Sequence, residues 1–154
     1  MTRERTVRRP ERPRDKLGRP LPWGSASEIE LEDYASLTLL ANHTLAIAHF
    51  NAGRFFQAHE AWEESWRKAE GSADEAFFKG LAQLGAAYTH YARGNAHGAR
   101  VLLERALERI EPSAPSYLDI DISRVVPRFR EHVDALGDAE REEAALPDIQ
   151  PPEL

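Results

Sequence analysis

The sequence predicts an all-α protein, a single-domain bundle of about five antiparallel helices. Three observations lead to this fold class. Apolar residues recur every three or four positions across residues 27–136, which is the spacing of one face of an α-helix. Glycines and prolines divide this pattern into segments of helical length with short turns between them. No stretch alternates apolar and polar residues for long enough to predict a β-strand.

The first two helices are expected on either side of Gly53, which interrupts the apolar pattern. Ser27 and Glu30 have the spacing of a capping box, in which each side chain accepts a hydrogen bond from a backbone N–H group near the other residue. We therefore expect the first helix to begin there. The second helix is expected over residues 54–70, and Gly71 is suited to end it because glycine tolerates the left-handed backbone of a helix C-cap.

The remaining three helices follow the same logic. Ser72 and Glu75 repeat the capping-box spacing and predict a third helix that closes at Gly94. The fourth helix is expected at about residues 96–110, because the prolines that follow cannot continue it. The fifth helix should begin near residues 121–123. This succession of helical pairs is faintly similar to tetratricopeptide-like hairpins, although the repeat length and signature of that family are not met.

Charge is unevenly distributed along the chain. Residues 1–22 carry eight Lys and Arg against three Asp and Glu, a net charge of +5, whereas the rest of the chain carries twelve against twenty-three, a net charge of −11. We interpret residues 1–26 as a disordered basic arm, residues 27–136 as the helical domain and residues 137–154 as an acidic mobile tail. Because an acidic body repels nucleic acid, we do not expect nucleic acid as a partner.

Composition also limits the chemistry and the location of the protein. The chain has no cysteine, which excludes disulfides, a thiolate nucleophile and a cysteine-ligated zinc site. No apolar run is long enough to span a membrane, and no apolar segment follows the basic N-terminus as it would in a secretory signal. We therefore expect a cytoplasmic protein without membrane contact. The sequence does not indicate its oligomeric state.

The segment most informative about function lies in the second expected helix. Four of its residues occur at positions i, i+4, i+7 and i+11 and so share one helix face: Phe55, His59, Trp62 and Trp66. Glu63 follows His59 by four positions, so the two side chains can meet, and Glu60 borders the same face. A histidine and carboxylates on an aromatic face need polar partners, because an isolated buried charge is costly.

The third expected helix offers such partners. Gly80, Gln83, Ala87 and His90 fall on one of its faces. Small residues at several positions of this helix, Gly80 among them, would let two helix backbones approach closely. We therefore predict a buried polar cluster between the second and third helices, formed by His59, Glu63, Gln83 and His90.

Three motifs in order make the chain similar to a known family. Phe-Phe-x-Ala-His-Glu-x-Trp-Glu-x-x-Trp occupies residues 55–66, Phe-x-Gly-Leu-x-Gln begins at residue 78, and Gly-Asn-x-x-Gly-Ala begins at residue 94. Together they resemble the domain of unknown function 309 family over about residues 45–110. The resemblance implies a small helical fold. It also implies that five residues are the family's hallmark, supported by Gly80, Gln83 and His90: these five are His59, Glu60, Trp62, Glu63 and Trp66. It implies no particular activity.

Two chemical interpretations compete at this motif. His59 and Glu63 could bind one divalent metal ion, with His90 as a third ligand from the neighbouring helix. Without a metal, His59 paired with Glu60 or Glu63 could serve as the acid–base catalyst of a small hydrolase-like enzyme. The zinc-protease helix has a second histidine where this chain has Glu63. We therefore expect no cofactor, with a divalent metal as the exception to test.

Two non-catalytic interpretations also fit. The polar groups could form a hydrogen-bonded core network, or a partly open aromatic face could bind a peptide or small ligand. In the second case the binding residues would be Phe55, Trp62, Trp66, Gln83 and His90.

Our leading hypothesis is a non-enzymatic binding or scaffold module that takes a protein segment or small ligand. The alternative is the hydrolase-like enzyme with His59, Glu60 and Glu63 as candidate catalytic residues. A sealed cluster favours the module, and an open pocket where His59, Glu63 and His90 converge favours the enzyme. The sequence leaves open whether any reaction is catalysed.

Overall fold

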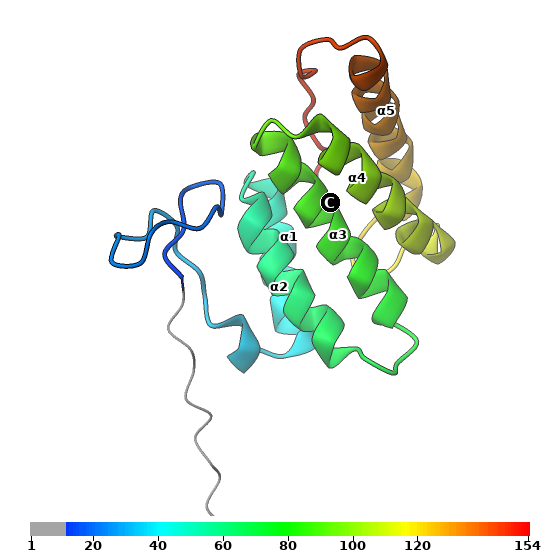
Figure 1. Cartoon of the computed structure of the whole chain (residues 1–154). Helices are drawn as coiled ribbons and strands as arrows, with labels where there is room; N and C mark the ends of the chain where they lie inside the picture. The colour runs from blue at the N-terminus through cyan, green and yellow to red at the C-terminus, as the bar shows by residue number, and fades with distance from the viewer. Residues whose placement is uncertain (1–11) are drawn as a thin grey trace, which may run out of the picture. The chain divides into compact units, whose positions relative to one another are not determined.

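The computed structural model describes residues 12–154 and has the predicted all-α architecture. Five α-helices follow one another along the chain (Figure 1). Of two single-turn 3₁₀ helices, one precedes the first α-helix and the other lies between the fourth and the fifth. The α-helices are α1 (Leu39–Asn51), α2 (Phe55–Lys68), α3 (Glu75–Ala92), α4 (Ala96–Ile110) and α5 (Ile122–Arg141). The 3₁₀ helices are η1 (Tyr34–Ser36) and η2 (Glu111–Ser113). Within residues 12–154 there is no β-strand, and only two isolated β-bridges occur.

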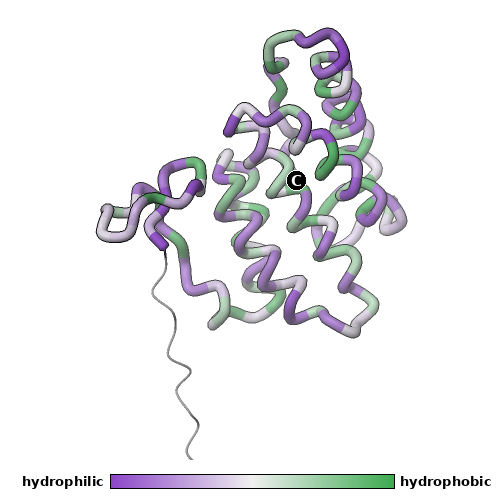
Figure 2. The backbone as a smooth tube through the Cα atoms, in the orientation of Figure 1, coloured by the Kyte–Doolittle hydropathy of each residue, from purple (hydrophilic) through white to green (hydrophobic). Residues whose placement is uncertain are grey.

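Each α-helix packs against the next one in the chain, α1 on α2, α2 on α3, α3 on α4 and α4 on α5. Short turns join α1 to α2, α2 to α3 and α3 to α4 and make these neighbours antiparallel, whereas a longer segment that includes η2 joins α4 to α5. Apolar and polar stretches alternate along each helix (Figure 2), so each helix has an apolar face that can pack against its neighbours. An aromatic group lies at the centre of the core: the ring centroids of Phe50 are 5.7 Å from Tyr88 and 6.4 Å from Phe129, and all three residues are 1% exposed.

The first helix begins later than the capping-box spacing predicts. α1 starts at Leu39, and the hydroxyl of Thr38 accepts the hydrogen bond from the Ala41 N–H that caps it. The Ser27 hydroxyl is used differently, because it accepts from the backbone N–H of Arg14 and lies 3.1 Å from the Ile29 carbonyl. The helix-capping prediction at Ser27 was therefore wrong, since a serine hydroxyl can satisfy turn backbone as readily as a helix end.

The other helix boundaries lie close to their predicted positions. Asn95 and Asp121 are the N-caps of α4 and α5, and their side chains accept from backbone N–H groups three residues later. At the start of α3, Glu75 reaches back to the Gly71 N–H at 3.2 Å. Pro127 lies inside α5.

The chain divides between Glu30 and Leu31 into two units. In the first unit, residues 12–30 form a hydrogen-bonded turn. The Asp15 carboxylate accepts from the backbone N–H groups of Leu17 and Arg19, both at 2.9 Å, and Arg14 and Pro20 form an isolated bridge. The rest of the expected arm, residues 1–11, lies outside the described residues.

Residues 137–154 comprise the end of α5 and a segment without regular secondary structure. α5 continues to Arg141, and residues 144–154 then return to the helices of the second unit, as the red segment in Figure 1 shows. Ile149 and Leu154 pack against the core, and Tyr91 hydrogen-bonds the backbone at Pro147 and Ile149. This acidic segment thus contains two apolar residues that bury part of their surface against the helices.

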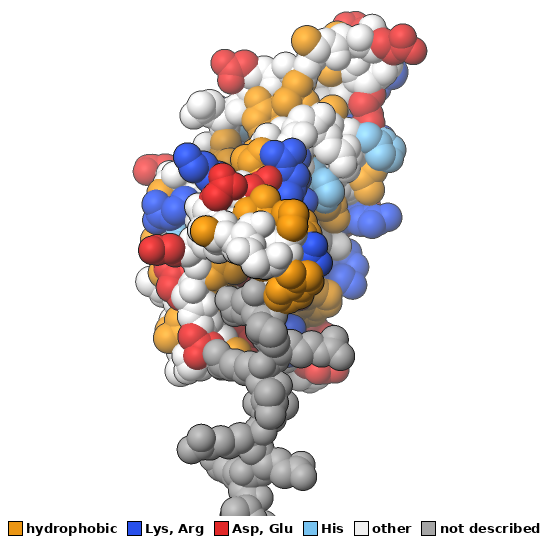
Figure 3. All heavy atoms as spheres, turned by 60° about the vertical axis from the view of Figure 1, so that its left-hand side comes forward, with side chains coloured by type: hydrophobic (Ala, Val, Ile, Leu, Met, Phe, Trp, Pro, Cys, Tyr) orange, Lys and Arg blue, Asp and Glu red, His pale blue; other side chains and the backbone are white. Residues whose placement is uncertain are grey.

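No helix within residues 12–154 has the length and apolar character needed to cross a bilayer. On the face drawn in Figure 3, acidic, basic and apolar side chains are interspersed, and histidine side chains reach the surface among them. The net negative charge of the chain is therefore not gathered into one continuous acidic patch on this face.

Candidate functional site

His59, Glu60 and Glu63 lie along the border between the buried face of α2 and solvent. The helix buries a stripe that fits the 3.6-residue period: Ala58, Ala61, Trp62, Ser65 and Ala69. His59, Glu60 and Glu63 are half-buried. They sit at one edge of the stripe because each residue of an α-helix turns by about 100° from the one before it.

Close contact between α2 and α3 brings His59 to the α3 backbone. A Cβ atom added at Gly85 would lie 2.9 Å from the His59 backbone nitrogen, so only glycine fits there. The His59 Nδ1 atom lies 2.8 Å from the Ala82 carbonyl oxygen. Gly80, one of the small residues that were predicted to allow this close approach, instead faces Ile110 of α4.

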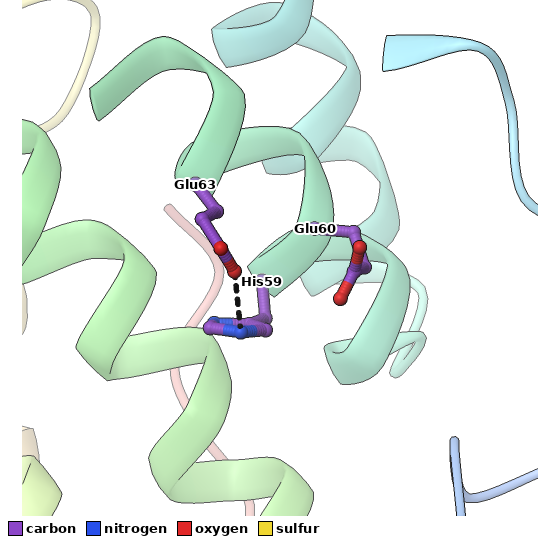
Figure 4. Close-up of side chains that lie close together, drawn as sticks. All are labelled: His59, Glu60 and Glu63. Atoms are coloured by element: carbon purple, nitrogen blue, oxygen red, sulfur yellow. Dashed lines mark ion pairs between the residues drawn. The ribbon is translucent and has the colours of Figure 1, made fainter. Parts of the chain in front are cut away.

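The other ring nitrogen of His59 meets Glu63. Nε2 lies 3.1 Å from Glu63 Oε2, the pair marked in Figure 4. Since a carbonyl oxygen can only accept, Nδ1 carries a proton, and Nε2 can donate to Glu63 only when the imidazole is doubly protonated. Burial disfavours that charged form, but the bonds to Glu63 and Ala82 outweigh it, so the pKa of His59 is raised above its usual value. The bond from His59 in turn lowers the pKa of Glu63.

The predicted cluster is not sealed. The side chains of His59 and Glu63 are 26% and 40% exposed, respectively, so both are accessible to a ligand from solvent. Glu60 comes from the same helix, and one ligand atom from each of His59, Glu60 and Glu63 lies within 4.8 Å of the others. In Figure 4 all three side chains extend from one side of α2. An imidazole nitrogen and two carboxylates at this separation are a donor set that zinc and similar divalent ions accept.

Trp62 does not join this group. It is fully buried, and its indole N–H donates to Nδ1 of His43 at 3.1 Å. The His43 Nε2 atom in turn lies 2.8 Å from the Leu118 carbonyl oxygen. Burial lowers the pKa of His43, so the neutral imidazole completes a chain of two hydrogen bonds. Trp62 is therefore a core residue, and Phe55 is also directed elsewhere, with its ring 5.3 Å from that of Phe50.

The α3 residues that were predicted as partners of His59, Gln83 and His90, join it only in part. Gln83 is half-buried, and its Oε1 atom is buried with no hydrogen-bond partner among residues 12–154. His90 Nδ1 lies 3.1 Å from the Asn95 side-chain nitrogen. Burial lowers the pKa of His90, and the nearby charges of Arg93 and His59 lower it further. His90 is thus within electrostatic range of His59, but it is not part of the three-residue group with Glu60 and Glu63.

A pocket lies directly beside this group. Its volume is about 250 Å³, and five residues from α2, the following turn and the start of α3 line it: Glu63, Trp66, Arg67, Glu70 and Glu75. The ammonium group of Lys79 lies 5.3 Å from the centre of the Trp66 ring. Arg67 forms an ion pair at 2.9 Å with Glu64, which does not line the pocket. Glu63 and Trp66 were predicted from the sequence as site residues. Glu70 and Glu75 were not, because in the sequence they resemble ordinary solvated charges.

A larger hollow of about 430 Å³ lies between α4 and α5, on residues that sequence reasoning did not select. Its lining is mainly acidic: Glu104, Leu107, Glu108, Glu111, Arg130, Val133 and Asp134. Arg130 pairs with Glu111 there. No histidine or aromatic residue lines it, so it offers less varied chemistry than the smaller pocket beside Trp66.

Residues 44–102 match the model of a family described as domain of unknown function (DUF309), which confirms the family resemblance. The matched range contains α2 and α3, and therefore the His59 group and the whole pocket beside Trp66. No curated protein and no solved structure matches the chain.

Proposed function

We propose that the DUF309 region of this chain belongs to a non-enzymatic binding module, in which the pocket beside Trp66 takes a positively charged side chain of a partner protein. The observation that carries this proposal is the lining of that pocket, which combines an indole with the carboxylates of Glu63, Glu70 and Glu75. The proposal sets this binding in the cytoplasm, because a chain without cysteine needs no oxidising compartment.

The chemistry of the lining favours a cation. Carboxylates attract an ammonium or guanidinium group, and the face of an indole attracts it as well. The contact between Lys79 and Trp66 is an example of this attraction within the chain itself. Arg67 also lines the pocket, but Glu64 and Glu63 lie within 4 Å of it and offset its charge.

The size of the pocket favours a side chain over a whole small molecule. Its volume of about 250 Å³ is below the roughly 300–1,000 Å³ of typical small-molecule sites. A single lysine or arginine side chain, presented by a protein segment, fits such a space.

Acid–base catalysis by His59 has weaker support. A general base needs a ring nitrogen directed at the substrate. In His59, Nδ1 is bonded to the Ala82 carbonyl and Nε2 faces Glu63. The enzymatic alternative would require Glu63 to move away first.

A second candidate is supported by the convergence of His59, Glu60 and Glu63 within 4.8 Å. If a divalent ion replaced the proton on His59 Nε2, the Ala82 carbonyl would keep the opposite nitrogen protonated and the ring oriented, as outer-shell partners of metal-bound histidines do. The full chain would be freed of metal and titrated with Zn²⁺ by calorimetry. Stoichiometric binding that is lost in His59→Ala supports this candidate. His97→Ala is the matched control, since His97 also pairs with a glutamate, Glu140, and an equal loss there would contradict it.

The leading proposal is tested by NMR titration of the full chain with a lysine-rich peptide and a glutamine-substituted copy of it. The lysine peptide should shift the indole N–H signal of Trp66 at moderate salt, and Glu70→Gln should weaken that shift. Glu108→Gln, in the hollow between α4 and α5, changes the net charge equally and should leave the shift unaltered. Equal weakening by both variants would mean that the peptide responds to overall charge and not to this pocket.

A further inference from the structure

We propose that a second surface, where α1, α3 and α5 meet, is a docking site for an extended segment of a partner protein, and that residues 144–154 occupy it within the chain. We call these residues the strap. The site is independent of the pocket beside Trp66, since Asn51, Tyr91 and Arg124 form it. The partner segment would be extended, contain proline, and carry apolar side chains five positions apart, as the strap does.

The polar contacts to the strap are hydrogen bonds to its backbone. The Tyr91 hydroxyl donates to the Pro147 carbonyl at 2.7 Å and accepts from the Ile149 N–H at 3.1 Å. The Asn51 side-chain oxygen accepts from the Leu154 N–H at 2.8 Å. Arg124 donates to the Glu153 carbonyl at 2.8 Å. Because all four bonds go to main-chain atoms, another extended segment could make them whatever its side chains are.

The apolar contacts supply the selectivity. Ile149 and Leu154 are half-buried and pack against the core, whereas Leu146 is 39% exposed. Residues 144–154 have no helix, strand or turn of their own. Prolines at positions 147, 151 and 152 restrict the backbone before it binds, which reduces the conformational entropy lost on docking. Recognition of a preformed extended segment through two apolar anchors is a general mode of peptide binding.

The docking surface and the strap differ in their position relative to the residues that match the family model. Asn51 and Tyr91 are within residues 44–102, which match the DUF309 model, and the strap is outside them. Arg124 of α5 is also outside the matched range, so two of the three residues that bind the strap backbone lie within it. A partner segment of the same chemistry could replace the strap. The strap would compete with it at high local concentration, because it belongs to the same chain as the docking surface.

The test uses the full chain with its strap released. The double variant Ile149→Asp/Leu154→Asp removes both apolar anchors, and the probe is a fluorescently labelled peptide with the natural sequence of residues 144–154. The wild-type chain should not bind the probe, and the double variant should bind it in a saturable manner. Adding Tyr91→Phe to the double variant should weaken binding by about tenfold, because two hydrogen bonds are lost. Leu146→Asp is the matched control, since it adds a charge at an exposed strap position and should behave as wild type.

Hydrogen exchange of the strap amides is measured on the same variants. Faster exchange in the double variant together with probe binding supports the proposal. Faster exchange without probe binding overturns it, because an open surface then fails to accept a segment. Unchanged exchange also overturns it, because Ile149 and Leu154 would then not be what holds the strap. If the double variant does not fold, Tyr91→Phe alone should still accelerate strap exchange, and no acceleration would count against the proposal.

Discussion

Gly85→Ala probes the contact that positions His59. A Cβ atom at residue 85 would lie 2.9 Å from the His59 nitrogen, 3.0 Å from its Cα and 3.1 Å from its Cβ. Two of these atoms belong to the α2 backbone, which cannot turn aside as the tip of a side chain can. The substitution should therefore push α2 and α3 apart and lengthen the bond between His59 and the Ala82 carbonyl.

The magnitude follows from two opposing effects. Overpacking of a filled interior costs about 1–3 kcal/mol, and replacing glycine by alanine inside a helix returns up to about 1 kcal/mol. Because backbone is displaced, we take the upper part of the first range and expect a net loss of about 2 kcal/mol. For a chain of this length that loss lowers the melting temperature by roughly 4–8 °C.

Thermal unfolding followed by circular dichroism measures this effect, and Gly137→Ala is the matched control. Gly137 also lies inside a helix, but the nearest atom to an added Cβ is the flexible tip of Arg141 at 3.3 Å. That variant should be as stable as wild type or gain up to about 1 kcal/mol. If Gly85→Ala melts at or above the wild-type temperature, the close approach of α2 and α3 at this residue is refuted.

Three further effects are expected. Burial is the main reason for a lowered pKa at four histidines, which are His43, His49, His90 and His132. The unfolded chain takes up these protons near the ordinary imidazole pKa of 6.5 while the folded chain resists them, so the free energy of unfolding should be highest above that pH and fall as pH drops below it. His59, whose pKa is raised, acts in the opposite sense, and a melting temperature that rises on acidification from pH 7 to 5.5 would contradict the balance of four histidines against one. Trp62→Phe should destabilise the fold by at least about 1 kcal/mol in urea unfolding, because it leaves buried His43 Nδ1 without its donor. Thr38→Ala should cost about 1 kcal/mol by removing the N-cap of α1, and no change in urea midpoint would contradict that assignment.

The pairing of His59 with Glu63 was predictable because it is local. Two residues four positions apart on a helix are neighbours whatever the helix packs against. The partner of Trp62 was not predictable in the same way. Trp62 and His59 were expected to share a face, but the face is wide enough that Trp62 turns into the core toward His43 while His59 meets the backbone of α3 at Ala82.

The small residues of α3 show the same limit. Gly80 and Gly85 both permit close packing in sequence, but they are five positions apart and face different helices, α4 and α2. Sequence indicated that some glycine of α3 would allow a close approach. It could not indicate which neighbour each glycine faces, because that depends on the order in which the helices pack.

The amino-acid sequence by itself determined the all-α fold, the extents of α2 to α4, the start of α5 and the family resemblance around the His59 motif, because apolar periodicity, turn residues and local motifs act over a few neighbouring positions. Tertiary structure alone decided that Thr38 caps α1, that Glu70 and Glu75 share a pocket with Trp66, and that residues 144–154 return to the helices. These outcomes depend on contacts between distant segments, and their free energies are set by which surfaces meet, which no local pattern encodes.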